Sequence, residues 1–210
     1  MKYLGKPAGM WALFAGSFEK HLTVEFDLTA GQAKDVAARA KKKYREIIAK
    51  LPEFDKRDRF EMNIVNCAML AAFILCMPQR PDIKTLTDYY AAAMMTPTME
   101  AFCRASGKKK FTPKDIEGMK ATAKLRAGDR NPYSWNMDFF EYEDGSGYEA
   151  RFTTCGICTL MQALGLYDLT PALCHLDYTM SDAGGASDFV REYTLASGGP
   201  YCDCGYHKKQ

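Results

Sequence analysis

Apolar positions between Thr29 and Gly128 recur at the spacing of amphipathic helices. The first run covers residues 33–51. A capping box precedes it: Thr29 is followed three residues later by Gln32, and their side chains accept the free backbone N–H groups at the helix start. Pro52 ends the helix. Residues 56–77 are apolar on nearly every face, which predicts a buried and central helix.

Two more helical stretches complete this half of the chain. Residues 82–106 keep the helical spacing, and we expect Pro97 to kink or divide them. Thr112 and Pro113 supply an N-cap and a first-turn proline for a last helix that ends near residue 128.

After residue 131 the pattern changes to short strands. Residues 135–142 and 148–154 predict two strands joined by a Gly- and Asp-containing hairpin turn. Helices are expected from about residue 155 and from Thr170, and further strands over 187–195 and 201–208. The order β-β-α-α-β-β predicts an α+β fold in which a four-stranded antiparallel sheet carries helices on one face.

The change of pattern near residue 130 divides the chain into two regions. Residues 1–130 form the helical region, and residues 131–210 form an α+β region that carries a cluster of cysteine and aspartate residues. We expect the helices to pack directly on the sheet, so that both regions form one compact unit.

Composition narrows the classes of partner. The chain has 210 residues, of which 47% are hydrophobic and 26% charged, which excludes intrinsic disorder and indicates a soluble folded protein. The net charge of +2 creates no overall basic field, so we expect a small-molecule substrate and no nucleic acid.

No apolar run approaches the roughly 20 residues of a membrane-spanning helix. Residues 10–15 are a short apolar stretch without a convincing cleavage site, so we expect a cytoplasmic protein. The oligomeric state stays open.

The eight cysteines fall into two groups. Cys67, Cys76 and Cys103 lie on apolar helices, where a cysteine behaves as a small core residue. The other five lie in the last third of the chain: Cys155, Cys158, Cys174, Cys202 and Cys204. This second group carries the candidate chemistry. Cys202 and Cys204 are two residues apart on an expected strand, so they share one face of it, with Asp203 on the other.

Three kinds of chemistry are compatible with the second group. A structural zinc ion would draw on Cys155, Cys158, Cys174, Cys202, Cys204 and His207, although only one pair has the CxxC spacing of a zinc knuckle. A thiol–redox site would use the CxxC at a helix start, where the helix dipole favours a thiolate, but the expected βαβ context is missing. The third is hydrolytic. Cys174 and Asp177 share one side of a helix, and a thiolate beside a carboxylate supplies a nucleophile and a proton carrier.

Several segments of the last third together resemble the L-2-amino-thiazoline-4-carboxylic acid hydrolase family. They are Tyr148–Cys155, Leu164–Pro171, Leu173–Tyr178, Arg191–Gly199 and Cys202-Asp203. The resemblance covers about residues 130–208. It implies an enzyme without a cofactor that opens a cyclic amidine by hydrolysis, as in the conversion of 2-amino-thiazoline-4-carboxylate to N-carbamoyl-cysteine. The site residues that it implies are Cys155, Cys174, Asp177, Arg191, Cys202 and Asp203.

The resemblance suggests a role for each of these groups. Asp177 would be the base that activates water, and Cys202 or Cys174 would be the nucleophile or the proton donor. Arg191 would hold a substrate carboxylate, and Asp203 would orient a neighbour. Cys155 is either a site residue or part of the packing at a helix end.

The chain departs from the family pattern at two places beside the expected site. Cys204-Gly205-Tyr206-His207 follows the closing Cys-Asp, where an aromatic and a basic residue are usual, and Cys158 is additional. The alternative to an enzyme is a non-enzymatic sensor domain that binds a metal ion or a small ligand through the same cysteines.

Overall fold

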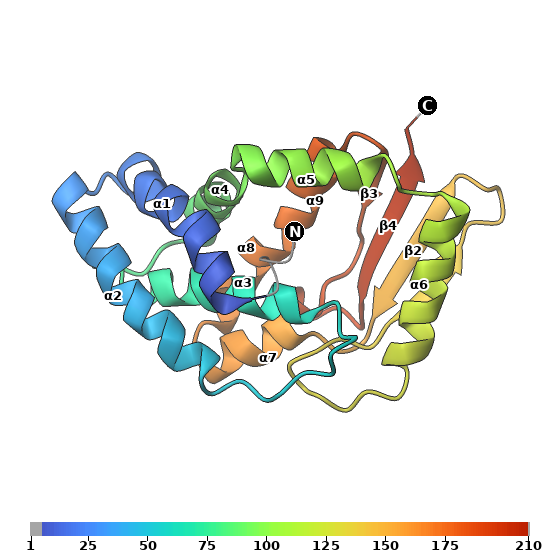
Figure 1. The fold of residues 1–210 in the computed structure, drawn as a ribbon, viewed down its shortest axis with the longest axis horizontal. Coiled ribbons are helices and arrows are strands. Elements are labelled where there is room, and N and C mark those ends of the chain that lie inside the picture. Colours follow the sequence, from blue (N-terminus) through green and yellow to red (C-terminus); the bar gives the residue numbers. More distant parts are fainter. Residues whose placement is uncertain (1–5, 210) are drawn as a thin grey trace.

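The computed structural model describes residues 6–209 and has the α+β architecture that the sequence predicts (Figure 1). The helices of the first region are α1 (Pro7–Glu25), α2 (Ala30–Ile48), α3 (Glu61–Ile74), α4 (Ile83–Met94), α5 (Pro97–Gly107) and α6 (Pro113–Arg126). The second region contains β1 (Asp138–Glu141), β2 (Gly147–Phe152), α7 (Gly156–Ala163), α8 (Thr170–Cys174), α9 (Leu176–Gly184), β3 (Ser187–Val190) and β4 (Cys202–Lys208), with short 3₁₀ turns at Tyr167–Leu169 and Leu195–Ser197.

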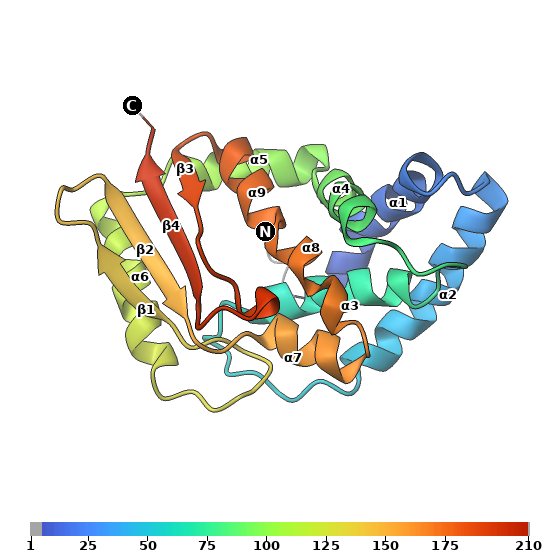
Figure 2. The ribbon, with the colours of Figure 1, turned by 180° about the vertical axis from the view of Figure 1, so that it is seen from behind.

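The sheet is antiparallel throughout, with the strand order β1-β2-β4-β3. Figure 2 shows the strands side by side at one end of the molecule, while α1, α2 and α4 form the other end. Between them lie α3 and α7–α9, and α5 packs along α9. The sheet is therefore joined to the helical region mainly through the helices that lie between β2 and β3 in the sequence.

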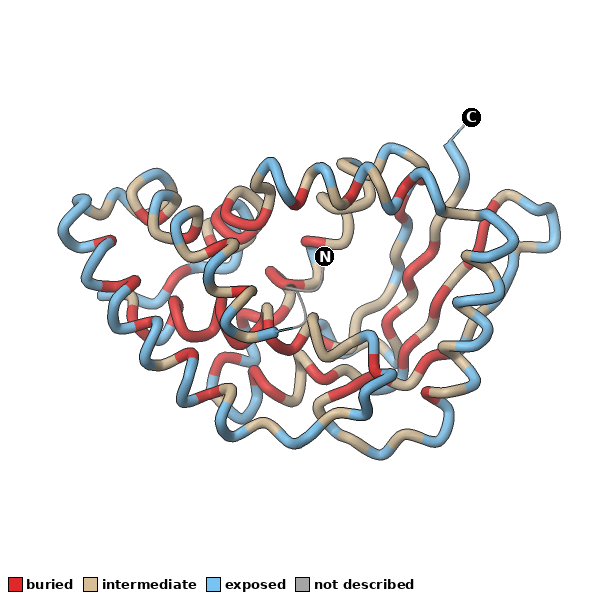
Figure 3. Tube along the Cα trace, viewed as in Figure 1, coloured by how far each residue is buried: buried red, intermediate tan, exposed pale blue. Residues whose placement is uncertain are grey.

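The predicted central helix is confirmed. Every residue of α3 from Ile64 to Ile74, except Asn66, is buried. Figure 3 shows that buried residues gather where the helices face one another and along the strands, and one continuous apolar core includes both regions. No helix within residues 6–209 combines the length and the apolar character needed to cross a membrane.

The sequence analysis missed α1. Its buried side chains, Met10, Phe14, Phe18 and Leu22, recur every four residues and so line one face of a helix. That face packs against α2 and α4, and the hydroxyl of Tyr89 donates a hydrogen bond to the carbonyl of Phe18 (3.1 Å). The short apolar stretch at residues 10–15 is thus part of the core.

Two predicted strands are shorter than expected because side chains capture their backbone groups. The first begins at Asp138, since the carbonyl of Trp135 accepts a hydrogen bond from Arg126 and the N–H of Asn136 donates to Thr154 Oγ1. The strand predicted over 187–195 ends at Val190, after which a carboxylate binds two successive N–H groups.

A buried ion pair fixes the chain between α6 and β1. Arg126 at the end of α6 is only 1% exposed, and its guanidinium contacts the carboxylates of Asp58 (3.2 Å) and Asp129. Its Nε donates to the carbonyl of Trp135 (2.9 Å). The other oxygen of Asp58 accepts the N–H of Phe60 (2.8 Å), so the same network holds two aromatic residues in place.

We predict that Arg126→Met lowers the free energy of unfolding by about 3–5 kcal/mol, because it leaves the buried carboxylate of Asp58 without its counter-charge. Urea unfolding measures the loss. Lys124→Met is the matched control, since it removes an exposed positive charge from the same helix and should change stability by no more than about 0.5 kcal/mol. Equal stability losses in the two variants would contradict the prediction.

Candidate active site

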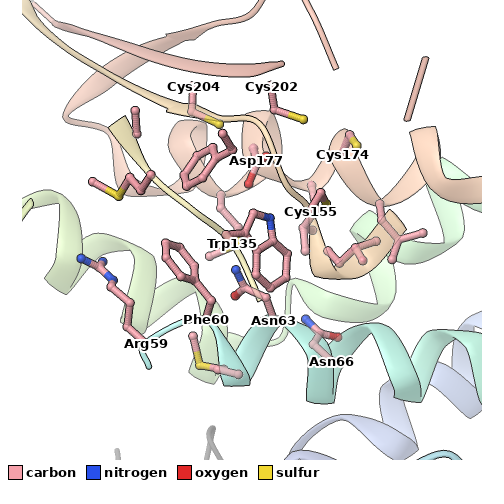
Figure 4. Close-up of a pocket in the computed structure, with 18 of the residues that line it drawn as sticks. Arg59, Phe60, Asn63, Asn66, Trp135, Cys155, Cys174, Asp177, Cys202 and Cys204 are labelled. Carbon is pink, nitrogen blue, oxygen red and sulfur yellow. The ribbon is translucent and has the colours of Figure 1, made fainter. Parts of the chain in front are cut away.

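The main cavity, of about 260 Å³, lies between the inner face of the sheet and helices α3, α5, α6 and α9. Six residues of the predicted cluster and its surroundings line it: Cys155, Cys174, Asp177, Arg191, Cys202 and Cys204. Figure 4 shows the four cysteines and the aspartate. The structure thus brings together all but one of the site residues that the family resemblance implies.

Strand alternation places the β4 cysteines in the cavity. Cys202, Cys204 and Tyr206 are two residues apart, so they share the inner face of the sheet. The register with β2 sets Cys202 opposite Phe152 and Cys204 opposite Ala150, and these neighbours also line the cavity. The sequence analysis expected the two cysteines to share a face, with Asp203 on the other.

Asp203 is the predicted site residue that lies outside the main cavity. Its two carboxylate oxygens accept the N–H groups of Glu192 and Tyr193, both at 2.7 Å. A carboxylate with two such bonds anchors the segment that leaves β3. Asp203 therefore fixes the chain immediately after Arg191, which agrees with an orienting role.

Arg191 is engaged by the protein itself. Its Nη2 contacts Asp177 Oδ2 (2.6 Å) and Cys204 Sγ (2.8 Å), its Nη1 donates to the carbonyl of Cys174 (2.9 Å), and its Nε donates to the carbonyl of Asp203 (3.0 Å). The side chain is 6% exposed. These bonds position Asp177 and leave little of the guanidinium for a substrate carboxylate.

Cys155 is the N-cap of α7, so its side chain lies at the positive end of that helix. The following Gly156 is required there, because an added Cβ would stand 2.1 Å from the carbonyl oxygen of Tyr133. The Cys158 thiol lowers the pKa of Cys155, and the N–H groups of Cys158 and Ile157 and the Trp135 side chain act in the same direction against burial. Cys155 is the cavity thiol for which the surroundings favour the thiolate.

The other four thiols of the cluster have the opposite environment. Burial raises the pKa of Cys174 to about 12, and it also raises the pKa values of Cys202 and Cys204. Interaction with Cys155, followed by burial, raises the pKa of Cys158 as well. These four thiols are neutral at pH 7, so they can donate weak S–H hydrogen bonds but are poor nucleophiles.

His207, one of the predicted zinc ligands, does not line the cavity that holds Cys155, Cys174, Cys202 and Cys204. His207 is on the outer face of β4, where its ring stacks on Tyr142 at 4.6 Å and its Nδ1 is 3.2 Å from Ser146 Oγ. Within residues 6–209, no group of three or more histidine, cysteine, aspartate or glutamate side chains is arranged to hold a metal ion. Elemental analysis of the purified protein would test the zinc hypothesis directly.

Two polar residues of α3 line the cavity and were missed from the sequence. They are Asn63 and Asn66, the uncharged polar residues of an otherwise apolar stretch. The side-chain oxygen of Asn66 is buried and has no hydrogen-bond partner among the described residues. A polar residue in a helix that is buried on all sides is the signal that could have identified them. Arg59 and Trp135 complete this wall of the cavity (Figure 4).

Fold and site together define an α+β protein with a cavity that contains both a thiol set apart from its neighbours and an arginine-paired carboxylate. The family model for L-2-amino-thiazoline-4-carboxylic acid hydrolase matches residues 62–206. The chain belongs to this family, whose name describes a hydrolase. Neither the curated proteins nor the solved structures include a match.

We predict that iodoacetamide alkylates Cys155 at lower pH than the other cavity thiols, because a lowered pKa keeps the thiolate populated as the pH falls. Peptide mass spectrometry after timed alkylation measures the rate at each cysteine. In Cys158→Ala the midpoint of the Cys155 profile should move to higher pH, since the largest stabilising contact is removed. Cys76→Ala, at a buried cysteine outside the cavity, is the control. An unchanged midpoint in Cys158→Ala would refute the assignment.

Proposed function

We propose that the protein hydrolyses a 2-amino-thiazoline-4-carboxylate-like cyclic amidine, with Cys155 as the nucleophile and Asp177 as the base. The observation that carries the proposal is the position of Cys155 at the start of α7: the Cys158 thiol and backbone N–H groups favour its thiolate, and it lines the same cavity as Asp177. Membership of the family supports the substrate class. The neutral Cys174 and Cys202 do not react with the substrate; they line the cavity around the reacting atoms.

In the first half of the reaction, the Cys155 thiolate adds to the ring carbon that carries two nitrogens and the sulfur. The bond from this carbon to the ring sulfur then breaks, and the sulfur leaves as a thiolate. The enzyme now holds an S-amidino adduct that contains all atoms of the substrate. The S–H groups of Cys174 and Cys202 line the same cavity and would hydrogen-bond the departing sulfur without transferring their protons.

In the second half, water displaces the enzyme sulfur. Asp177 takes one proton from the water, whose oxygen adds to the amidino carbon. The second proton moves from that oxygen to the nitrogen of the former ring as the Cys155–carbon bond breaks. The product is the N-carbamoyl amino acid. The proton held by Asp177 passes to the product thiolate or to solvent, so the enzyme returns to its starting state. Arg191 acts as a positioning residue, because its bond to Oδ2 fixes the carboxylate of Asp177 (2.6 Å).

The unpaired oxygen of Asn66 supports an amidine as the bound group. A buried acceptor without a partner is costly, and an amidine N–H is the complementary donor. Asn66 and Cys155 line the same cavity, on helices α3 and α7 that pack against each other. A bond from Asn66 to the substrate nitrogen would hold the ring carbon toward the thiolate.

We predict that Cys155→Ser abolishes the release of N-carbamoyl-cysteine from 2-amino-thiazoline-4-carboxylate, because a neutral hydroxyl replaces the thiolate. Asp177→Asn should lower kcat by about 10²–10⁴-fold, the usual contribution of a general base. Chromatographic assay of the product measures both. Cys76→Ser, which alters a buried thiol outside the cavity, should retain wild-type turnover.

Two results would contradict the proposal in different ways. Full turnover by a folded Cys155→Ser variant would place the nucleophile elsewhere. No turnover by the wild-type protein on this substrate or on related cyclic amidines would show that the substrate class is wrong. Near-ultraviolet circular dichroism of each variant confirms that its tertiary packing is intact.

A further inference from the structure

A second cavity, also of about 260 Å³, adjoins the main one. Arg59, Phe102, Met119, Asp177, Met180 and Tyr206 line both. The two are therefore neighbouring lobes of one space, and Asp177 stands where they meet. The thiols of the candidate site lie in the first lobe, and Lys110 and Cys103 line the second.

Lys110 is directed inward by the turn between α5 and α6. Its Nζ lies 3.2 Å from the centre of the Tyr206 ring and 5.3 Å from that of Tyr148. The next residue, Phe111, has a φ of 63°, a left-handed conformation unusual for a side chain of this size. The carboxylate of Asp115 stabilises this turn by accepting the N–H of Phe111 (2.9 Å).

The charges of the second lobe are unevenly paired. Asp115 accepts bonds from Phe111 and from the hydroxyl of Tyr148 (3.0 Å), and Asp177 is paired with Arg191. By contrast, no carboxylate among the described residues lies within ion-pair distance of Arg59 or Lys110. The contact of Arg59 in this region is a long one, from Nη1 to Met119 Sδ (3.6 Å).

We propose that Arg59 and Lys110 bind the anionic group of the substrate, a carboxylate carried by the ring or by a short chain on it. Two cations without a carboxylate partner among the described residues, in a partly closed and aromatic-lined space, complement an anion. Arg191, which the sequence analysis expected to hold the carboxylate, is already bound to Asp177 and two carbonyls. The inference rests on the proposed function for the identity of the ring but not for the anionic group.

The lysine also gives the site a pH dependence. Burial lowers the pKa of Lys110 to about 8. The charged and titratable groups around it are Arg59, Asp115, Tyr148, Asp177, Cys204 and Tyr206. An anion should therefore bind more weakly as the pH rises through 8, because Lys110 loses its charge. Arginine stays charged over this range, so Lys110→Arg should remove that decline.

The test is calorimetric titration of the Cys155→Ser variant, which binds without turnover, with 2-amino-thiazoline-4-carboxylate and with uncharged 2-aminothiazoline. We expect the acid to bind at least about tenfold more tightly than the uncharged ring, because its carboxylate forms charge-assisted hydrogen bonds with the two cations. Adding Arg59→Met or Lys110→Met should reduce this preference several-fold. Lys109→Met removes a neighbouring exposed charge outside both cavities and should leave it unchanged. Equal affinity for the acid and the uncharged ring would overturn the inference even if both are substrates.

A second probe separates this inference from the proposed function. Succinate carries anionic groups but no reactive ring, and its binding is read from the melting temperature of the wild-type protein. Stabilisation that disappears in Arg59→Met and Lys110→Met supports the anion site even if no thiazoline is hydrolysed. If neither succinate nor the thiazoline acid binds in an Arg59- and Lys110-dependent way, the inference is wrong, whatever the outcome of the turnover assay.

Discussion

The guanidinium of Arg191 joins the sheet to the helices around the main cavity. It is buried just after β3, and it binds the end of α8 through the carbonyl of Cys174, the start of α9 through Asp177, and β4 through the carbonyl of Asp203. A buried guanidinium requires several acceptors in one plane, so these segments can take few other arrangements. The position of Asp177 beside the thiols follows from this single group.

Chemical differences among the cavity thiols arise from their surroundings. Cys155 lies at the start of α7, where the Cys158 thiol and backbone N–H groups favour its ionised form. Burial raises the pKa values of Cys174, Cys202 and Cys204. The same cavity therefore favours the ionised form of one thiol and the neutral form of the others. Asp58 and Arg126 affect the cavity without lining it. Asp58 accepts the N–H of Phe60, and Arg126 donates to the carbonyl of Trp135, so both aromatic residues are held in the cavity wall.

Local patterns in the sequence predicted much of the fold. The capping box at Thr29 and the N-cap at Thr112 each begin a helix, and strand alternation correctly placed Cys202 and Cys204 on one face. Features that depend on contacts between distant parts of the chain could not be predicted from the sequence. The four-residue spacing of Met10 and Phe14 could be recognised as core only with α2 and α4 beside it. Likewise, Asp203 ends β3 through bonds to Glu192 and Tyr193, which spacing alone does not show.

Only part of the candidate site could be predicted from the sequence, because the rest depends on contacts between distant segments. Family resemblance pointed to Asp177 and to the cysteines, and the CxxC predicted a thiol at a helix start, but the sequence does not show that this thiol shares a cavity with Asp177. Nor does it show that Arg191 is occupied, or that Arg59 and Lys110 approach from the other region of the chain. These relations depend on how α3, α5 and α6 pack against the sheet.

The central claim is that Cys155 forms a covalent adduct during turnover. Asp177→Asn should slow the second half of the reaction more than the first, so the S-amidino adduct should accumulate after mixing with 2-amino-thiazoline-4-carboxylate. Acid quenching followed by intact-protein mass spectrometry should show a gain equal to the mass of the whole substrate, and peptide mapping should locate it on Cys155. An adduct on Cys174 or Cys202, or no adduct while the wild-type protein turns the substrate over, would contradict the account.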